Sequence, residues 1–106
     1  MAKVDYLFDA AGNWIAFRRG QFVYSPTGAW LGWVPKGGRQ VFDVDGLYLG
    51  TLFESDRLFK EMFPQETLNT SHPGYPGREE PADHPGYPGR VELPIGMEDV
   101  SLLQHA

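Results

Sequence analysis

The sequence predicts an all-β protein: a small barrel-like assembly of three, or with a degenerate copy four, repeated β-hairpins, followed by one short helix and an extended tail. Three observations indicate this fold class. A hairpin motif occurs three times, each copy contains a turn that ends in glycine, and a segment rich in proline and glycine follows. A chain of 106 residues has the length of one domain with a tail.

The hairpin motif occupies residues 7–17, 23–33 and 41–51, which read LFDAAGNWIAF, VYSPTGAWLGW and VFDVDGLYLGT. Every copy has an aliphatic residue, an aromatic residue, and then Asp or Ser. Two variable positions come next, then a glycine and one more variable position. Trp or Tyr follows, and then Ile or Leu. The copies are offset by about 16 to 18 residues, which suits a β-hairpin plus its connector.

Each copy turns through a tetrapeptide with the composition of a type I turn, at residues 9–12, 25–28 and 43–46. Asp or Ser at the first position can bond forward to the backbone, and glycine at the fourth accepts the left-handed conformation that a bulge requires. We therefore predict structural turn glycines with positive φ at three positions: Gly12, Gly28 and Gly46.

Residues 43–46, with the sequence DVDG, also resemble the start of a calcium-binding loop. The second copy has Ser25 and Thr27 where the third has Asp43 and Asp45, so the glycine is repeated and the carboxylates are not. A calcium loop would also need further oxygen ligands at regular spacing. We interpret the stretch as a turn and predict neither a metal site nor a cofactor.

A bulge placed at the glycine predicts the cross-strand pairs. Aromatic pairs fall on one face: Phe8–Trp14, Tyr24–Trp30 and Phe42–Tyr48. Aliphatic pairs fall on the other: Leu7–Ile15, Val23–Leu31 and Val41–Leu49. The next pairs place a small residue on the second strand: Tyr6–Ala16, Phe22–Gly32 and Gln40–Gly50. Both faces are apolar, whereas a solvated sheet alternates apolar and polar residues. We expect an aliphatic interior and an aromatic face that the tail, a partner or a ligand covers.

Residues 55–64, SDRLFKEMFP, predict a short helix. Ser55 is a suitable N-cap, the apolar residues share one side, and Pro64 ends the segment. The alternative is a strand of a degenerate fourth hairpin, because Leu58 and Phe59 repeat the aliphatic–aromatic start of each copy.

The rest of the chain differs in composition. Residues 1–63 carry seven basic and seven acidic residues, so the formal charge of −5 comes from residues 64–106. That segment contains the motif HPGYPGR twice, at 72–78 and 84–90, a composition that favours extended polyproline conformations. We predict a hairpin domain over 1–63 and an acidic extended tail over 64–106, and we expect the domain to fold without residues 71–106.

Residues 6–59 resemble the 4-fold beta flower domain family, a small bacterial family whose members string together hairpins of this type. The resemblance implies an all-β flower of hairpin petals and no established activity, although three clear petals are present rather than four. A weaker likeness is to PRC-barrel domains, which serve as docking modules, because residues 43–50 match their D-x-x-G-x-x-[LI]-G strands.

The composition argues against several function classes. There is no cysteine, and the three histidines all lie in the tail (His72, His84 and His105), so no nucleophile–base set or metal cluster is apparent and we predict no enzyme. Neither half is basic enough for nucleic-acid binding. No apolar stretch is long enough to cross a bilayer, and we expect a cytoplasmic protein.

We predict instead a protein-interaction or accessory subunit, which binds a protein partner or another copy through the aromatic face and the tail. The candidate contact residues are Trp14, Tyr24, Trp30, Trp33, Phe42, Tyr48, Pro73, Tyr75, Pro85 and Tyr87. The alternative is a module that binds a small ligand such as a carbohydrate, stacked on exposed Trp or Tyr rings.

Overall fold

The computed structural model describes residues 4–54, 56–64, 67–69, 73–77 and 85–100. Within these ranges the chain forms eight strands and no helix, which confirms the all-β fold class. The strands are β1 (Val4–Phe8), β2 (Trp14–Arg19), β3 (Phe22–Tyr24), β4 (Trp30–Trp33), β5 (Gln40–Asp43), β6 (Tyr48–Phe53), β7 (Arg57–Glu61) and β8 (Met97–Asp99).

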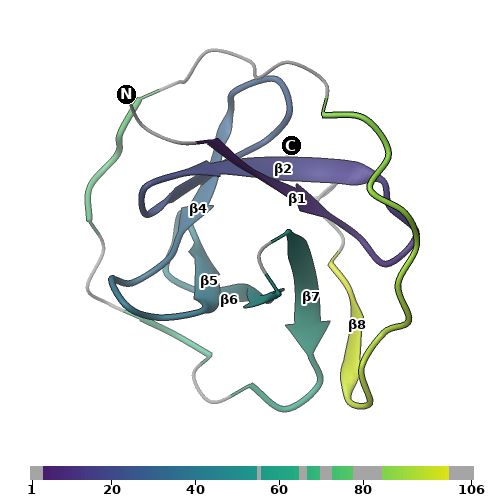
Figure 1. Cartoon of the computed structure of the whole chain (residues 1–106). Helices are drawn as coiled ribbons and strands as arrows, with labels where there is room; N and C mark the ends of the chain where they lie inside the picture. Colours follow the sequence, from purple (N-terminus) through teal and green to yellow (C-terminus); the bar gives the residue numbers. More distant parts are fainter. Residues whose placement is uncertain (1–3, 55, 65–66, 70–72, 78–84, 101–106) are drawn as a thin grey trace.

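Successive strands pair antiparallel from β1 to β8, and β1 also pairs with β7 in parallel. This last contact closes the first seven strands into a barrel (Figure 1). It is a single bridge, between Phe8 and Arg57, supported by a 2.8 Å hydrogen bond from the Phe8 N–H to the Asp56 carbonyl. We call this closure between β1 and β7 the seam.

The predicted helix over 55–64 is wrong, because residues 57–61 form β7. The last strand of the third hairpin, β6, has a free edge that needs hydrogen-bond partners, and β7 pairs with it from Thr51↔Phe59 to Phe53↔Arg57. The alternative prediction, in which this segment is a strand of a fourth hairpin, is the one that the structure shows. Ser55, the expected N-cap, lies outside the described residues.

The strands group into four hairpins, which we call petals 1 to 4: β1–β2, β3–β4, β5–β6 and β7–β8. Petals 1 to 3 turn through the predicted tetrapeptides. In petal 4, residues 62–96 separate the two strands, and we call this segment the belt. The belt includes both copies of HPGYPGR.

The turn geometry agrees with the prediction. Gly12, Gly28 and Gly46 have φ values of 94°, 92° and 86°. Each glycine N–H donates to the carbonyl of the Asp or Ser three residues earlier, at 2.9–3.1 Å. The side chains of Asp9 and Asp43 accept further bonds from the backbone, for example 3.0 Å from the Leu47 N–H to Asp43 Oδ1. These carboxylates therefore have structural roles in the turns.

The strand register is partly as predicted. The aromatic pairs Phe8–Trp14, Tyr24–Trp30 and Phe42–Tyr48 are confirmed. The aliphatic pairs and the pairs beyond them are wrong by one residue, because Leu7, Val23 and Val41 pair with the small residues Ala16, Gly32 and Gly50. A second bulge after each aromatic pair leaves one aliphatic residue of the second strand without a partner: Ile15, Leu31 and Leu49.

The small residues allow the next petal to approach closely. A Cβ on Gly32 would collide with the carbonyl oxygen of Phe42 in petal 3. A Cβ on Gly50 would lie 3.0 Å from the carbonyl oxygen of Phe59 in petal 4. Glycine at these positions thus allows the backbone of the neighbouring petal to approach closely.

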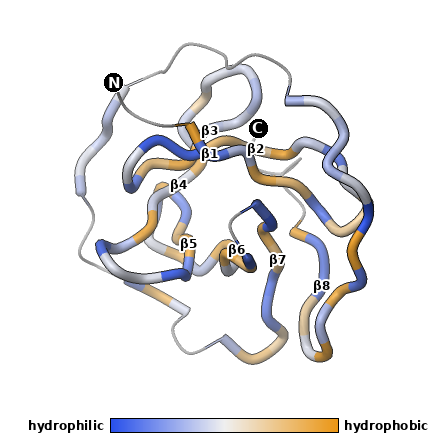
Figure 2. The backbone as a smooth tube through the Cα atoms, in the orientation of Figure 1, coloured by the Kyte–Doolittle hydropathy of each residue, from blue (hydrophilic) through white to orange (hydrophobic). Residues whose placement is uncertain are grey.

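The main cluster of buried side chains is aliphatic and draws on all four petals. Figure 2 shows hydrophobic residues along the strands of the barrel. The first strands contribute one residue each: Leu7, Val23, Val41 and Leu58. The second strands contribute the residue at the bulge: Ile15, Leu31, Leu49 and, in petal 4, Val100. Phe59 pairs with Asp99 as Phe8 pairs with Trp14, so Val100 is the equivalent of Ile15. Petal 4 therefore completes the core with a residue that follows the belt.

Candidate functional site

The described parts of the belt, residues 62–64, 67–69, 73–77 and 85–96, lie on the outside of the barrel and contact the petals in the order 3, 2, 1, 4 (Figure 1). At petal 3 it pairs with the turn: Leu68 bridges Leu47, and the Asn69 N–H donates to the Gly46 carbonyl at 2.7 Å. The Tyr48 N–H donates to the Thr67 carbonyl at 2.9 Å. The start of the belt is thus held by main-chain hydrogen bonds.

At petal 2 the contact is between aromatic rings. Tyr75, from the first HPGYPGR copy, lies on Trp30 with ring centroids 5.3 Å apart and planes at 45°. The Trp30 indole is itself held in place, because its Nε1–H donates to the Gly32 carbonyl at 2.7 Å. Trp14 makes the equivalent bond to Ala16 at 2.8 Å in petal 1. The repeated tryptophans are therefore fixed platforms, and one of them carries a belt tyrosine.

At petal 1 the second HPGYPGR copy lies against the turn. A Cβ on Gly12 would collide with the Tyr87 ring and would lie 2.9 Å from the Gly89 carbonyl oxygen. The Val91 N–H donates to the Ala10 carbonyl at 2.9 Å. The belt then returns to petal 4, where the Met62 N–H donates to the Gly96 carbonyl at 2.8 Å. Contacts within this one chain therefore hold the predicted tail against the barrel.

The structure divides the predicted contact residues into three groups. Three aromatic residues are buried inside the chain: Tyr24, Trp33 and Phe42. Three more are half-buried at the second-strand positions: Trp14, Trp30 and Tyr48. The belt residues lie at the surface, with Pro85 partly covered and the others exposed: Pro73, Tyr75, Pro85 and Tyr87. A partner that meets the folded chain thus encounters the belt first.

Sequence reasoning missed an apolar group at the end of petal 4. Met62, Phe63 and Ile95 flank the hydrogen bond between Met62 and Gly96, and their exposed fractions are 57%, 93% and 106%. We call these three residues the belt tip. The belt tip was missed because the predicted helix placed Met62 and Phe63 on the shared apolar side of that helix.

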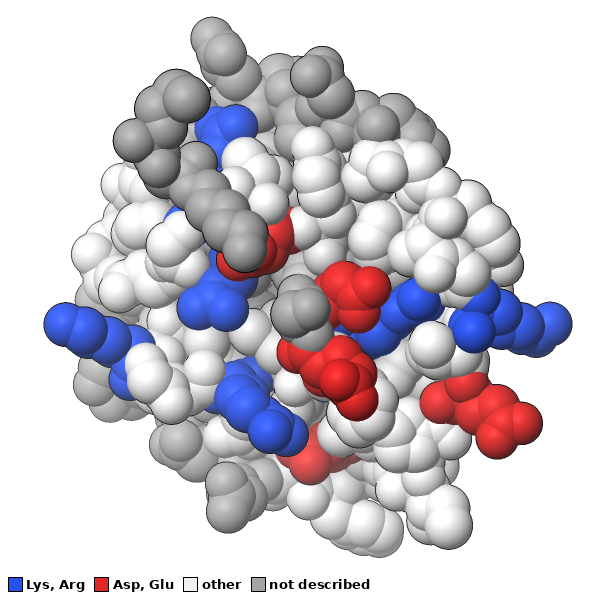
Figure 3. Space-filling view, in the orientation of Figure 1, with Lys and Arg blue, Asp and Glu red and all other residues white. Residues whose placement is uncertain are grey.

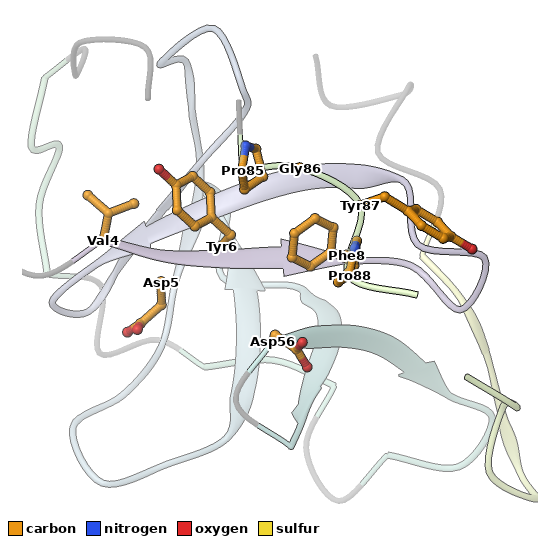
Figure 4. A pocket seen from close by; sticks show the side chains of 9 residues that line it. All are labelled: Val4, Asp5, Tyr6, Phe8, Asp56, Pro85, Gly86, Tyr87 and Pro88. Atoms are coloured by element: carbon orange, nitrogen blue, oxygen red, sulfur yellow. The ribbon is translucent and has the colours of Figure 1, made fainter. Parts of the chain in front are cut away.

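A cavity of about 330 Å³ lies beside the seam, between β1 and the second HPGYPGR copy (Figure 4). Its described lining residues are Val4, Asp5, Tyr6, Phe8, Asp56, Pro85, Gly86, Tyr87 and Pro88. Figure 4 shows Tyr6 and Phe8 beside Pro85 and Pro88, with Asp5 and Asp56 on the other side of the view. We call it the seam pocket. Its lining combines aromatic rings, prolines and two carboxylates.

A second cavity, of about 400 Å³, lies at petal 3 and is lined by Pro35, Gly38, Arg39, Gln40, Phe42, Thr51 and Glu61. Beside it three groups form a closed ring of hydrogen bonds. Tyr48 donates to Thr51 at 2.8 Å, Thr51 donates to Glu61 Oε2 at 3.0 Å, and the Glu61 N–H donates to the Tyr48 oxygen at 2.8 Å. Burial raises the pKa of Tyr48, because the phenolate would lose hydration.

A family model described as the 4-fold beta flower protein matches residues 1–93. The chain belongs to the 4-fold beta flower family. The match includes β1 to β7 and most of the belt, so the belt is part of what the family shares with this flower protein. Neither the search of curated proteins nor that of solved structures found a match.

The charges on the flower are mixed. Figure 3 shows Asp and Glu side chains gathered in the middle of one face, with Lys and Arg side chains around them. Among the described residues, no group of three or more His, Asp or Glu side chains is placed to hold a metal ion. All three histidines lie outside the described ranges. The described part of the flower protein has no helix long and apolar enough to span a bilayer.

Proposed function

We propose that this flower protein is a non-catalytic interaction module that docks on another protein through its belt. One observation carries the proposal. Of the nine large hydrophobic side chains that are exposed among the described residues, seven belong to the belt: Met62, Phe63, Leu68, Tyr75, Tyr87, Leu93 and Ile95. The barrel buries its own apolar residues well, whereas the belt presents them to solvent. Exposed apolar groups of this kind are typical of interaction sites.

The belt tip is the part of this surface best suited to act as an anchor. Phe63 and Ile95 are almost fully exposed, and the backbone bond between Met62 and Gly96 holds the two arms of the tip together. Preorganised aromatic and aliphatic anchors that fill a pocket supply most of the binding energy of an interface, and truncation of such a residue typically costs ~2 kcal/mol or more.

The charge around the tip favours a basic partner over a second copy. Glu92 and Glu98 are exposed on the arm that contains Ile95, and Glu61 is partly exposed at the end of β7, on the other arm. Residues 64–106 carry the entire formal charge of −5. Two copies meeting tip to tip would bring these like charges together, whereas basic residues around an apolar pocket would complement them. We therefore propose a different protein with a basic rim as the partner, in the cytoplasm.

Sugar binding remains the alternative function, and the structure offers it less ring surface than the sequence suggested. Trp33 is 2% exposed, and Tyr75 covers one side of Trp30. Trp14 is half-buried, with its indole N–H bonded to a backbone carbonyl. A sugar that stacks on this protein would have to use Trp14 or the outer rings of the belt.

Site-specific photo-crosslinking in host cells tests the proposal. A photoreactive amino acid at position 95 is expected to form an adduct with one other protein, whereas the same group at position 45, an exposed turn residue, is not. Phe63→Ser should abolish the adduct, and Val44→Ser, at the turn of petal 3, should not. Adducts only between copies of this chain, or none at position 95, would contradict the proposal.

A further inference from the structure

The two HPGYPGR copies of the belt are repeated in structure as well as in sequence. Their described parts, residues 73–77 and 85–89, both run without strand or turn. The two glycines of the first copy have φ values of 93° and 87°, and those of the second have 83° and 93°. The tyrosines at their centres, Tyr75 and Tyr87, are 70% and 72% exposed. The two copies therefore present nearly the same surface to a partner.

The backbone of each copy differs from the continuous polyproline helix that its composition favours. That helix has φ of about −75° at every residue, whereas both glycines of each copy have positive φ. A Cβ on any of these four glycines would meet open space, so this side of both copies faces solvent. The feature that a partner can recognise in each copy is a tyrosine ring between two proline–glycine pairs.

The barrel holds the two copies on neighbouring petals. The Tyr75 ring lies on Trp30 of petal 2, and the Tyr87 ring lies so close to Gly12 of petal 1 that a Cβ there would collide with it. Contacts with the barrel therefore fix the separation of the two rings. A pair of contacts fixed in this way needs little further ordering when a partner binds.

The charge of the motif differs from that of the segment around it. Both copies end in arginine, and residues 64–106 contain no other Lys or Arg. Arg90, which ends the second copy, is exposed, and its counterpart in the first copy lies outside the described residues. A carboxylate on a partner would complement the arginine of the motif.

We propose that the two copies form one bivalent docking surface, whose partner is a protein that presents the same site at least twice, in its subunits or in tandem repeats. Each site is a pocket for the tyrosine ring with a carboxylate beside it. A site that fits one copy fits the other, because sequence, backbone and exposure agree. Once one site is occupied, the second contact forms within the same complex and gains from its high effective concentration.

This inference rests on the proposed docking function of the belt, but it does not rest on the belt tip, which consists of other residues. The carboxylates of the partner face the motif copies, whereas the proposed basic rim faces the tip.

Photo-crosslinking in host cells tests the inference with the full-length protein. Benzoylphenylalanine replaces Tyr75 in one variant and Tyr87 in another, which keeps an aromatic ring at each position. Mass spectrometry of the crosslinked peptides is expected to find one partner, joined through the same segment or through corresponding segments of two repeats. The same group at position 45, an exposed turn residue, should give no such adduct. Adducts with unrelated segments, with copies of this chain only, or none at all would overturn the inference.

Binding measurements with the protein so found test the bivalency. Tyr75→Ala and Tyr87→Ala should each weaken binding by about tenfold or more and by similar factors, because either change leaves a single contact. Val44→Ala, at an exposed turn position, is the control and should have no effect. If Tyr87→Ala loosens the belt at Gly12, Arg90→Gln replaces it and should weaken binding about threefold. Unchanged affinity with half the number of bound partner molecules would show two independent sites and overturn the proposal.

The crosslinks also separate this inference from docking by the belt tip. An adduct at position 95 with none at 75 and 87 would support the tip as the anchor and overturn the bivalent surface. Adducts of 75 and 87 with equivalent segments, and none at 95, would support the bivalent surface and contradict the tip.

Discussion

Arg57 and Gly89 are joined by a 2.9 Å hydrogen bond from a guanidinium nitrogen to a main-chain carbonyl. The other terminal nitrogen of Arg57 donates to the Asp9 carbonyl at 2.8 Å, and the residue is 3% exposed. Its Nε forms an ion pair with Asp56 without hydrogen-bond geometry. One buried side chain therefore connects petal 4, the turn of petal 1 and the belt.

Arg57→Lys should destabilise the protein by about 2–4 kcal/mol, because a single ammonium cannot reach both carbonyls and leaves buried acceptors without a donor. Urea unfolding followed by circular dichroism measures this free energy. Arg39→Lys, at an exposed position, is the control and should change stability by less than about 0.5 kcal/mol. A similar small change in both variants would show that the three-way connection contributes little.

Gly12→Ala should cost more than Gly37→Ala, although both glycines have positive φ, at 94° and 79°. The Cβ at residue 37 meets open space, so that change measures the backbone cost alone, roughly 1 kcal/mol. The Cβ at residue 12 also collides with the Tyr87 ring. The difference between the two unfolding free energies therefore reports how firmly the belt is held. Equal costs would mean that the belt moves aside freely.

Val100→Ala should destabilise the protein by about 2 kcal/mol, because Val100 is 8% exposed and fills the core position of petal 4. Val44→Ala, at an exposed turn position, should be nearly neutral. The expectation that the domain folds without residues 71–106 changes accordingly. Their removal takes away β8 and Val100, and we now expect a lower and less cooperative thermal transition, measurable by calorimetry.

Stability should also fall at alkaline pH through Tyr48. Burial of the phenol raises its pKa from the ordinary value of 10.0, and the Glu61 carboxylate acts in the same direction. The folded chain thus keeps this proton at pH values where the unfolded chain has lost it. The contribution is complete below pH 10 and is lost as pH rises through the folded-state pKa. Spectrophotometric titration of wild type against Tyr48→Phe isolates this group; superimposable stability profiles above pH 10 would exclude the effect.

The turns and the aromatic pairs were predictable because they are local. Asp9 and Gly12 lie within one tetrapeptide, and Phe8 meets Trp14 across it. The register beyond that pair was not predictable, because both faces of the hairpin are apolar. A shift of the register by one residue at Ile15 would neither place a polar side chain in the core nor remove one from it. The sequence pattern therefore does not distinguish the two registers.

Petal 4 and the path of the belt could not be predicted from local sequence patterns, for a different reason. Leu58, Phe59 and Met62 fit a helical period as well as a strand, and the free edge of β6 decides between them. β8 contains two acidic residues and shows no alternation of its own. The seam pocket depends on the path of the belt, which places residues 85–88 beside β1, and contacts between distant segments fix that path.

The position of β8 after the belt has a consequence for how the chain folds. Petals 1 to 3 consist of contacts close in sequence and can form while the chain is being synthesised. β7 emerges next and finds β6, but its outer edge must wait until the whole belt and β8 have left the ribosome. Closing so long a loop is entropically slow, and an unpaired strand edge recruits other chains. Petal 4 is therefore the last part to form and the point at which nascent chains are most prone to aggregate.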